Sequence, residues 1–106
     1  MKLYHATTVE RLASIREQGL RVACADSKAK IKGVWLHTSS QSAWAVVHTQ
    51  RKHGAALEDV VVVQVQVPRS RLVRFRTGLW YTRQDVPASA IGEAIPGVDF
   101  GASATE

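Results

Sequence analysis

The chain has little cysteine and no long apolar run, and each shortage excludes a class of protein. Its 106 residues include a single cysteine, Cys24, which excludes an internal disulfide and a zinc site built from several cysteines. No apolar stretch approaches the roughly 20 residues that a membrane-spanning helix needs, and the opening residues lack the apolar core of a signal peptide. We therefore expect a cytoplasmic protein that makes no use of a membrane.

Glycine-rich phosphate motifs and metal-ligand spacings are missing as well. The sequence contains no GxGxxG fingerprint and no phosphate-cradling glycine loop, which argues against a Rossmann unit. His48 and His53 stand five residues apart, a spacing that does not suit one helix face, and no carboxylate lies near them at ligand spacing. We therefore expect no metal site. Cys24 has no histidine or asparagine at a recognisable spacing, which argues against a thiol nucleophile.

Charge of negative sign is scarce, and the positive excess is concentrated in one stretch. Lysine and arginine number 14 against 9 aspartates and glutamates, a formal net charge of +5. Such a balance favours anionic partners, including nucleic acid. In a strand around Phe75, Arg74 and Arg76 would point to the same side and form a phosphate-binding face, although a solvated sheet face fits equally. The arginines of this stretch are Arg69, Arg71, Arg74, Arg76 and Arg83.

Hydrophobic residues make up 45% of the chain, which predicts one folded domain over 1–95 and a flexible tail over 96–106. Thr7-x-x-Glu10 has the spacing of a capping box, and the apolar stripe that follows predicts a helix over 9–18, ended by Gly19. A second helix is expected over 41–51, with Ser39 and Ser40 as caps, Ala43, Val46 and Val47 buried, and Gly54 after it. Strands are expected at 20–25, 34–38, 60–67, on both sides of Gly78, and at 90–95. The fold class is α+β, with mixed or antiparallel strands packed with two short helices.

Three side chains suggest a ligand pocket. His5 follows a strand and precedes a helix, where an imidazole can hold a ribose hydroxyl or transfer a proton. Trp35 and Trp44 lie on a strand and on the helix after it, so they could stack a flat heterocycle between them. The alternatives are a partly buried histidine bonded to a carbonyl and two tryptophans that fill the core.

The order of these pieces resembles the ADP-ribosyltransferase superfamily. LYHATTVERLASIREQGL is similar to the family's opening, in which a strand ending in His-Gly-Thr/Ser leads into a helix closed by Gly-Leu. KGVWLHTSSQSAWAV resembles the second motif, a strand followed by a serine-rich turn and a helix. The likeness spans 3–91. It is nearest to the small bacterial branches, which include rifamycin-modifying transferases, DNA-modifying toxins and the catalytic half of RNA 2′-phosphotransferases.

The resemblance implies a compact ADP-ribosyltransferase-like fold and an NAD site. His5 falls where the family's histidine bonds the NAD ribose, and Ala6 replaces a glycine whose backbone holds the nicotinamide amide. Trp35 takes the place of a tyrosine that stacks on nicotinamide. The positions that would form the NAD pocket are Tyr4, His5, Ala6, Thr7, Trp35 and Trp44.

The third motif departs from the family, because TGLWYTRQDVP contains no glutamate. One alignment places the catalytic position at Gly78, and the rifamycin-type pattern places it at Asp85, which we prefer. Cleavage of the nicotinamide–ribose bond builds positive charge on the ribose, which a carboxylate there would stabilise. The resemblance thus implies a mono-ADP-ribosyltransferase in which His5, Trp35 and Asp85 act on NAD and an acceptor that no motif identifies. An RNA 2′-phosphotransferase-like enzyme, or a nucleotide- or nucleic-acid-binding module without turnover, is the alternative.

Overall fold

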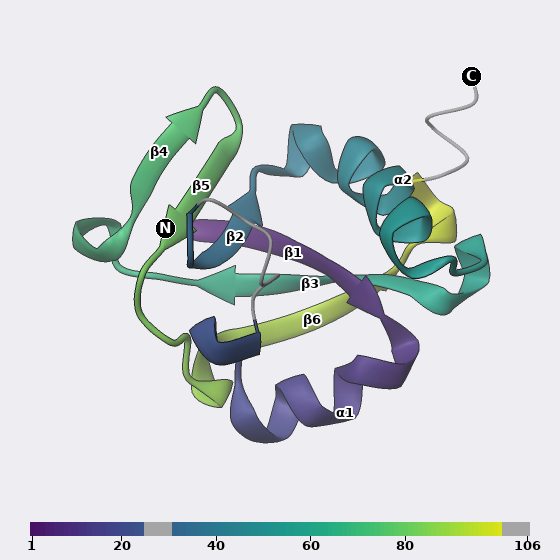
Figure 1. Cartoon of the computed structure of the whole chain (residues 1–106), viewed down its shortest axis with the longest axis horizontal. Helices are drawn as coiled ribbons and strands as arrows, with labels where there is room; N and C mark the ends of the chain where they lie inside the picture. Colours follow the sequence, from purple (N-terminus) through teal and green to yellow (C-terminus); the bar gives the residue numbers. More distant parts are fainter. Residues whose placement is uncertain (25–30, 101–106) are drawn as a thin grey trace.

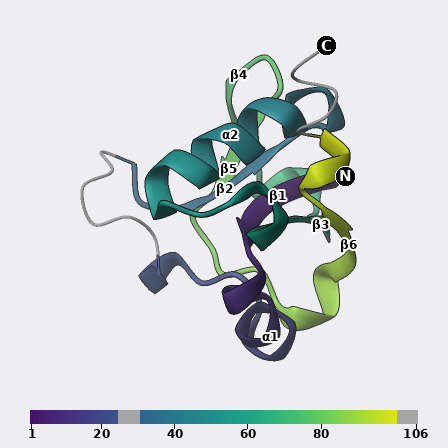
Figure 2. The same cartoon turned by 90° about the vertical axis from the view of Figure 1, so that its right-hand side faces the viewer.

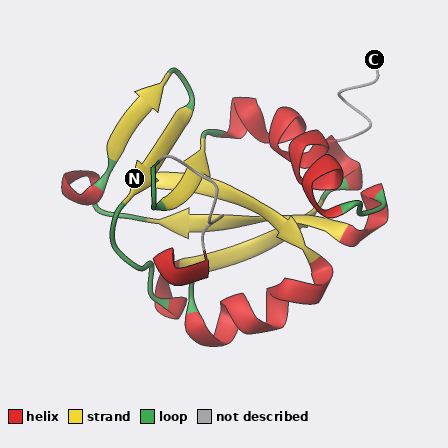
Figure 3. Cartoon of the chain, viewed as in Figure 1, coloured by secondary structure: helices red, strands yellow, loops and turns green. Residues whose placement is uncertain are grey.

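One six-stranded sheet organises the computed structural model, which describes residues 1–24 and 31–100 (Figure 1). The strands pair antiparallel throughout, in the order β4-β5-β2-β1-β3-β6, and two α-helices pack against them. The predicted α+β class with antiparallel strands is confirmed, and Figure 3 shows the strands gathered between the helices. The elements are β1 (Lys2–Thr8), α1 (Val9–Gln18), β2 (Val34–His37), α2 (Ser42–His53), β3 (Val60–Gln66), β4 (Val73–Arg76), β5 (Leu79–Thr82) and β6 (Ile91–Pro96).

The two helices cover opposite faces of the sheet, as the side view shows (Figure 2). Alternate residues of a strand point to opposite faces, and β3 supplies apolar residues to both. Val63 and Val65 pack with Ile15 of α1, whereas Val60 and Val62 pack with Val46 of α2. The predicted interior position of β3 is confirmed. A strand that is buried on both faces needs an uninterrupted apolar run, and the apolar residues of β3 supply it.

Helix α1 has the predicted bounds. Gly19 ends it with φ +76°, and its N–H donates to the carbonyl of Ile15 at 2.7 Å. A Cβ at Gly19 would lie 2.0 Å from the carbonyl oxygen of Val86, so only glycine fits here. The predicted capping box is wrong. Strand β1 continues through Thr8, which is the N-cap without a side-chain cap bond, and Thr7 is a buried strand residue.

The strand expected at 20–25 is also wrong over the described residues 20–24, and residue 25 lies outside them. Leu20 makes an isolated bridge with Val86, and Val22–Cys24 forms a 3₁₀ turn. Asp85 holds this turn by accepting a hydrogen bond from the backbone N–H of Val22. The carboxylate of Asp85, distant in the sequence, therefore accepts the hydrogen bond that a neighbouring strand would otherwise accept from this backbone.

Helix α2 begins later than expected and buries a partly different face. Ser39–Gln41 forms a 3₁₀ turn, so neither Ser39 nor Ser40 is the cap, and Gln41 precedes the helix. Gly54 ends the helix in the left-handed conformation, as predicted. Of the three residues expected to be buried, Val46 is, whereas Ala43 and Val47 are partly exposed. The buried residues of α2 are Ser42, Ala45, Val46 and Thr49.

The hairpin of β4 and β5 turns at Gly78, whose φ is +80°, as predicted. A bulge between Arg74 and Arg76 overturns the expectation that these two arginines share a face. Arg74 is opposite Trp80 and Arg76 is opposite Leu79, and neighbouring residues of β5 face opposite sides of the sheet.

The end of the described chain packs against the sheet. The N–H of Gly97 donates to the carbonyl of Val60 at 2.7 Å, and Phe100 contacts the apolar cluster under α2. The first residues of the predicted tail are therefore part of the packed structure, and 101–106 lie outside the described residues. Within the described ranges, no helix has the length and apolar character needed to cross a membrane.

Candidate functional site

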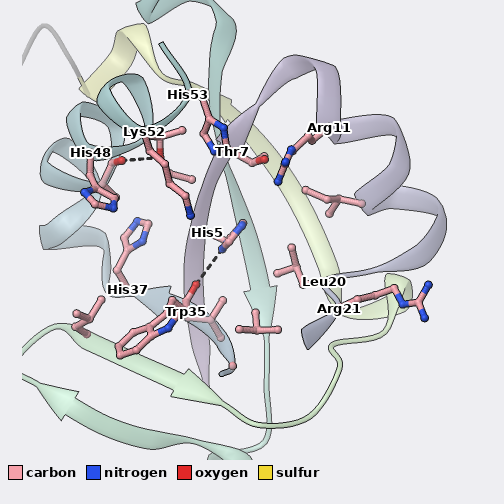
Figure 4. Close-up of a pocket in the computed structure, with 18 of the residues that line it drawn as sticks. His5, Thr7, Arg11, Leu20, Arg21, Trp35, His37, His48, Lys52 and His53 are labelled. Atoms are coloured by element: carbon pink, nitrogen blue, oxygen red, sulfur yellow. Dashed lines mark hydrogen bonds between the residues drawn. The ribbon is translucent and has the colours of Figure 1, made fainter. Parts of the chain in front are cut away.

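A cavity of about 450 Å³ lies where β1 and β2 part. The two strands are in register at Tyr4 and His37, whereas β1 pairs with β3 from Lys2 to Thr8. Side chains of α1 and α2 form much of the remaining wall (Figure 4), and Leu20, Arg21, Phe75 and Leu79 complete it. Where two strands separate, their backbone groups and side chains can contact a ligand. Continuous strand pairing would cover these groups.

The cavity wall is basic and rich in histidine. All four histidines of the chain line it, and so do three longer cations. Among the described lining residues there is no aspartate or glutamate. Such a wall suits an anionic ligand, because the field of several cations in a concave site adds up. The histidines are His5, His37, His48 and His53, and the other cations are Arg11, Arg21 and Lys52.

His5 crosses the seam between the strands. Its Nδ1 lies 2.9 Å from the carbonyl oxygen of Trp35. A carbonyl can only accept, so Nδ1 carries the proton and Nε2 of the neutral ring keeps a lone pair. Burial lowers the pKa of His5, the bond to Trp35 opposes this, and the positive charges of Lys52 and Arg11 lower it further. The result is a neutral imidazole whose Nε2 can accept a hydroxyl proton.

His37 forms a more deeply buried part of the wall. Its Nε2 lies 3.2 Å from Oγ of Ser42, and its ring stacks with that of Tyr4 at a centroid distance of 6.2 Å. Burial first, and then the proximity of His5, lower the pKa of His37 to about 4. This histidine is therefore neutral at physiological pH.

The third histidine with a shifted pKa lies on α2. Partial burial lowers the pKa of His53, and the positive charges of Arg11, Lys52 and His48 lower it further. A bound anion would reverse this trend by offsetting those charges. The basic groups of α1 and α2 thus act on one shared region of the cavity.

The structure brings together most residues that the sequence singled out. Trp35 contacts Phe75 edge to face at 5.1 Å and Tyr81 at 5.0 Å between ring centroids. Trp44 stacks on His48 at 5.2 Å, and 46% of its surface is exposed. Five of the predicted positions line the cavity: His5, Ala6, Thr7, Trp35 and Trp44.

Three other candidate positions lie elsewhere. Tyr4 is not among the lining residues; it lies on the face of β1 opposite to that of His5 and packs with the cluster under α2. Asp85 is exposed, and its Oδ1 accepts the 2.8 Å hydrogen bond from Val22. Gly78 forms the hairpin turn, where a Cβ would meet the side chain of Gln41 at 2.6 Å. Neither alternative for the third motif is a described part of the cavity wall.

Sequence reasoning missed most of the helical contribution to the cavity. Trp44, His48 and Lys52 recur every four residues, so they share one face of α2. On α1, Arg11, Ile15 and Gln18 share a face in the same way. This spacing is visible in the sequence, but it does not reveal that the two faces converge on His5.

No known protein-family profile matches this chain, and no curated protein is significantly similar to it. Within residues 1–24 and 31–100, no three His, Cys, Asp or Glu side chains gather closely enough to hold a metal ion.

Proposed function

We propose that this chain binds NAD in the cavity between β1 and β2 and transfers its ADP-ribosyl group to a nucleophilic acceptor. The observation that carries the proposal is the meeting of the first two motifs on one cavity: His5, Ala6 and Thr7 from β1, and Trp35 from β2. NAD would supply the nicotinamide–ribose bond, whose cleavage releases nicotinamide. An ADP-ribosyltransferase-like fold is part of this proposal, and it rests on the resemblance of the same two motifs to that superfamily.

The properties of the cavity support a dinucleotide ligand. Its volume of about 450 Å³ falls within the usual range of small-molecule sites. Trp35 offers an aromatic surface for a flat ring. Nε2 of His5 can accept a hydrogen bond from a ribose hydroxyl, and the basic residues of α1 and α2 can offset the charge of a pyrophosphate.

The described cavity wall contains no carboxylate, which limits the groups that could remove a proton from the acceptor. A neutral acceptor must lose a proton. The one lone pair of Nε2 of His5 is already used by the ribose hydroxyl in this arrangement, so another histidine of the wall, such as His53, would have to act as the base. A phosphate monoester is already mostly deprotonated at neutral pH and needs no base. Its oxygen would bond to C1 of the ribose while the bond to nicotinamide breaks, and nicotinamide would leave as a neutral molecule with the electron pair.

A second candidate function follows from this basic wall. Arg11, Arg21 and Lys52 would attract a phosphate acceptor, as an RNA 2′-phosphotransferase-like enzyme requires. A binding module without turnover is the remaining alternative, because Asp85 lies outside the described wall.

The test combines calorimetric titration with NAD and chromatographic detection of nicotinamide. We expect NAD to bind the wild type, and the His5→Ala variant to bind about tenfold more weakly through loss of a hydrogen bond. Lys2→Ala, on the exposed start of the same strand, is the matched control and should bind normally. Failure of the wild type to bind NAD would refute the proposal.

Acceptor specificity separates the enzyme classes. Nicotinamide release that requires an RNA oligonucleotide with an internal 2′-phosphate would support the phosphotransferase-like function. Release with protein or unphosphorylated nucleic acid would support ADP-ribosylation of those acceptors. Binding of NAD without release from any acceptor would support the binding module.

A further inference from the structure

Beside the cavity, strand β4 and helix α2 present aromatic rings and an arginine to solvent. We call this surface the β4 rim; it comprises Trp44, Phe75 and Arg76. Strand β4 forms one edge of the sheet, and all four of its residues are exposed. The exposed fractions of Phe75 and Trp44 are 52% and 46%. Exposed aromatic rings that lie close together mark a contact surface more often than isolated ones do.

Both rings are held in place although they are exposed. Phe75 meets Trp35 edge to face, and Trp44 stacks on His48 with ring planes 13° apart. Such contacts restrict the rings before any partner binds, which lowers the entropic cost of binding. The rim is therefore a preorganised aromatic surface.

The bulge in β4 adds a positive charge next to these rings. It turns Arg76 toward the side of the sheet on which Leu79 lies, and the guanidinium of Arg76 lies 5.8 Å from the ring centre of Trp44. Arg74 donates to Oγ1 of Thr77 and lies on the other face of the hairpin. From Val60 to Gln84 the sequence contains no aspartate or glutamate. Both faces of the hairpin are therefore basic.

We propose that the β4 rim binds single-stranded nucleic acid, with bases stacked on Phe75 and Trp44 and with a backbone phosphate on Arg76. Aromatic side chains stack only on bases that are not already stacked in a duplex, so a single strand fits this surface best. The cation is an arginine, whose planar guanidinium pairs with phosphate and stacks on rings.

The rim also adjoins the candidate site. Phe75 and Trp44 are lining residues of the cavity, so a strand on the rim would pass its mouth. The rim would then bring an acceptor in the nucleic acid to the cavity. Binding at the rim does not depend on NAD, so this inference is tested separately from the proposed function.

The experiment measures fluorescence anisotropy of a labelled mixed-sequence 12-nucleotide RNA and of its DNA counterpart, each single-stranded, over a range of salt concentrations. We expect binding that weakens steeply with salt, and Phe75→Leu should bind about tenfold more weakly because a stacking surface is lost. Leucine keeps an apolar contact with Trp35, and circular dichroism verifies the fold. Arg76→Gln should weaken binding and reduce the slope of log K against log salt by about 0.7, as expected for one phosphate contact to a single strand.

Arg16→Gln is the charge-matched control. Arg16 donates to the carbonyl of Gly92 in β6, the strand at the opposite edge of the sheet. We expect this variant to bind within twofold of the wild type. No binding at low salt, equal losses in Arg76→Gln and Arg16→Gln, or equal competition by a duplex or by polyglutamate would each overturn the proposal. Because Arg76 is outside the cavity lining, titration of Arg76→Gln with NAD and with RNA measures the NAD site and the rim separately, so the two can fail independently.

Discussion

The two edges of β1 meet very different neighbours. Along one edge, β3 pairs with β1 from Lys2 opposite Gln66 to Thr8 opposite Val60. Along the other edge, β2 is in register with β1 at Tyr4 and His37, and the cavity lies beyond this pair. On that side the carbonyl of Trp35 accepts a hydrogen bond from the side chain of His5.

The two edges of β1 therefore contribute differently: the β3 edge contributes to stability, and the β2 edge contributes to the candidate binding site. The β3 edge is surrounded by buried valines, and burial of apolar surface is the main favourable term in folding. The β2 edge has fewer backbone pairs and carries polar side chains that face a cavity. Binding residues need such openings, and a rigid neighbouring scaffold holds them in place.

The largest effect is expected on the β3 edge. Val65 is fully buried opposite the fully buried Leu3, and Val65→Asp would place an unpaired charge there, so it should destabilise the fold by about 4 kcal/mol or more. Val73→Asp is the matched control, because Val73 is 40% exposed, and it should change stability by about 0.5 kcal/mol or less. Urea denaturation measures both. Similar losses in the two variants would contradict the comparison.

The next largest effect is a dependence of stability on pH at the β2 edge. Burial lowers the pKa of His37 to about 4 from its ordinary value of 6.5. Between these values the unfolded chain binds a proton that the folded chain does not. The contribution of His37 is therefore complete above about pH 6.5 and is lost as the pH falls toward 4, at a cost of about 3 kcal/mol.

Urea denaturation between pH 7 and pH 4 measures this loss. His37→Gln retains a polar partner for Ser42 and does not titrate, so its stability should fall less over this range. A parallel decline in the wild type and in His37→Gln would show that His37 does not carry the effect.

A smaller effect is expected for ligand stacking on β2. Trp35→Ala should weaken NAD binding by about 1–3 kcal/mol, the range for loss of a stacked aromatic surface. Trp35→Tyr retains an aromatic ring and most of the volume, so it should bind NAD nearly as well as the wild type does. Calorimetry gives the affinities. Unfolding of Trp35→Tyr would indicate that Trp35 serves the core instead.

The smallest effect is expected at Asp85, far along the chain from both edges of β1. Asparagine keeps an oxygen that can accept the hydrogen bond from Val22, so Asp85→Asn should lower stability by about 1 kcal/mol or less. Nicotinamide release should then equal that of the wild type. A hundredfold fall in release with normal NAD binding would instead support the catalytic role that the sequence suggested.

Local patterns predicted the elements whose boundaries depend on local chemistry. Helix α1 ends at the predicted residue, because its last turn meets Gly19, whose positive φ suits glycine. Local patterns did not predict features that strand pairing decides, as for Arg76, whose direction depends on the bulge in the pairing of β4 with β5. The capping prediction at Thr7 was wrong for a related reason, since pairing with Val61 keeps Thr7 in β1 and moves the N-cap to Thr8.

By itself, the sequence determined the α+β class, the interior position of β3 and the placement of His5 and Trp35 in motifs that suggest a ligand site. Only the tertiary structure decided that His5 bonds to Trp35 across the seam, that Arg11 of α1 and Lys52 of α2 line the same cavity, and that Asp85 holds the turn at Val22. The reason is physical. Periodicity and capping act over a few residues, whereas a cavity forms where segments distant in sequence fail to close against one another.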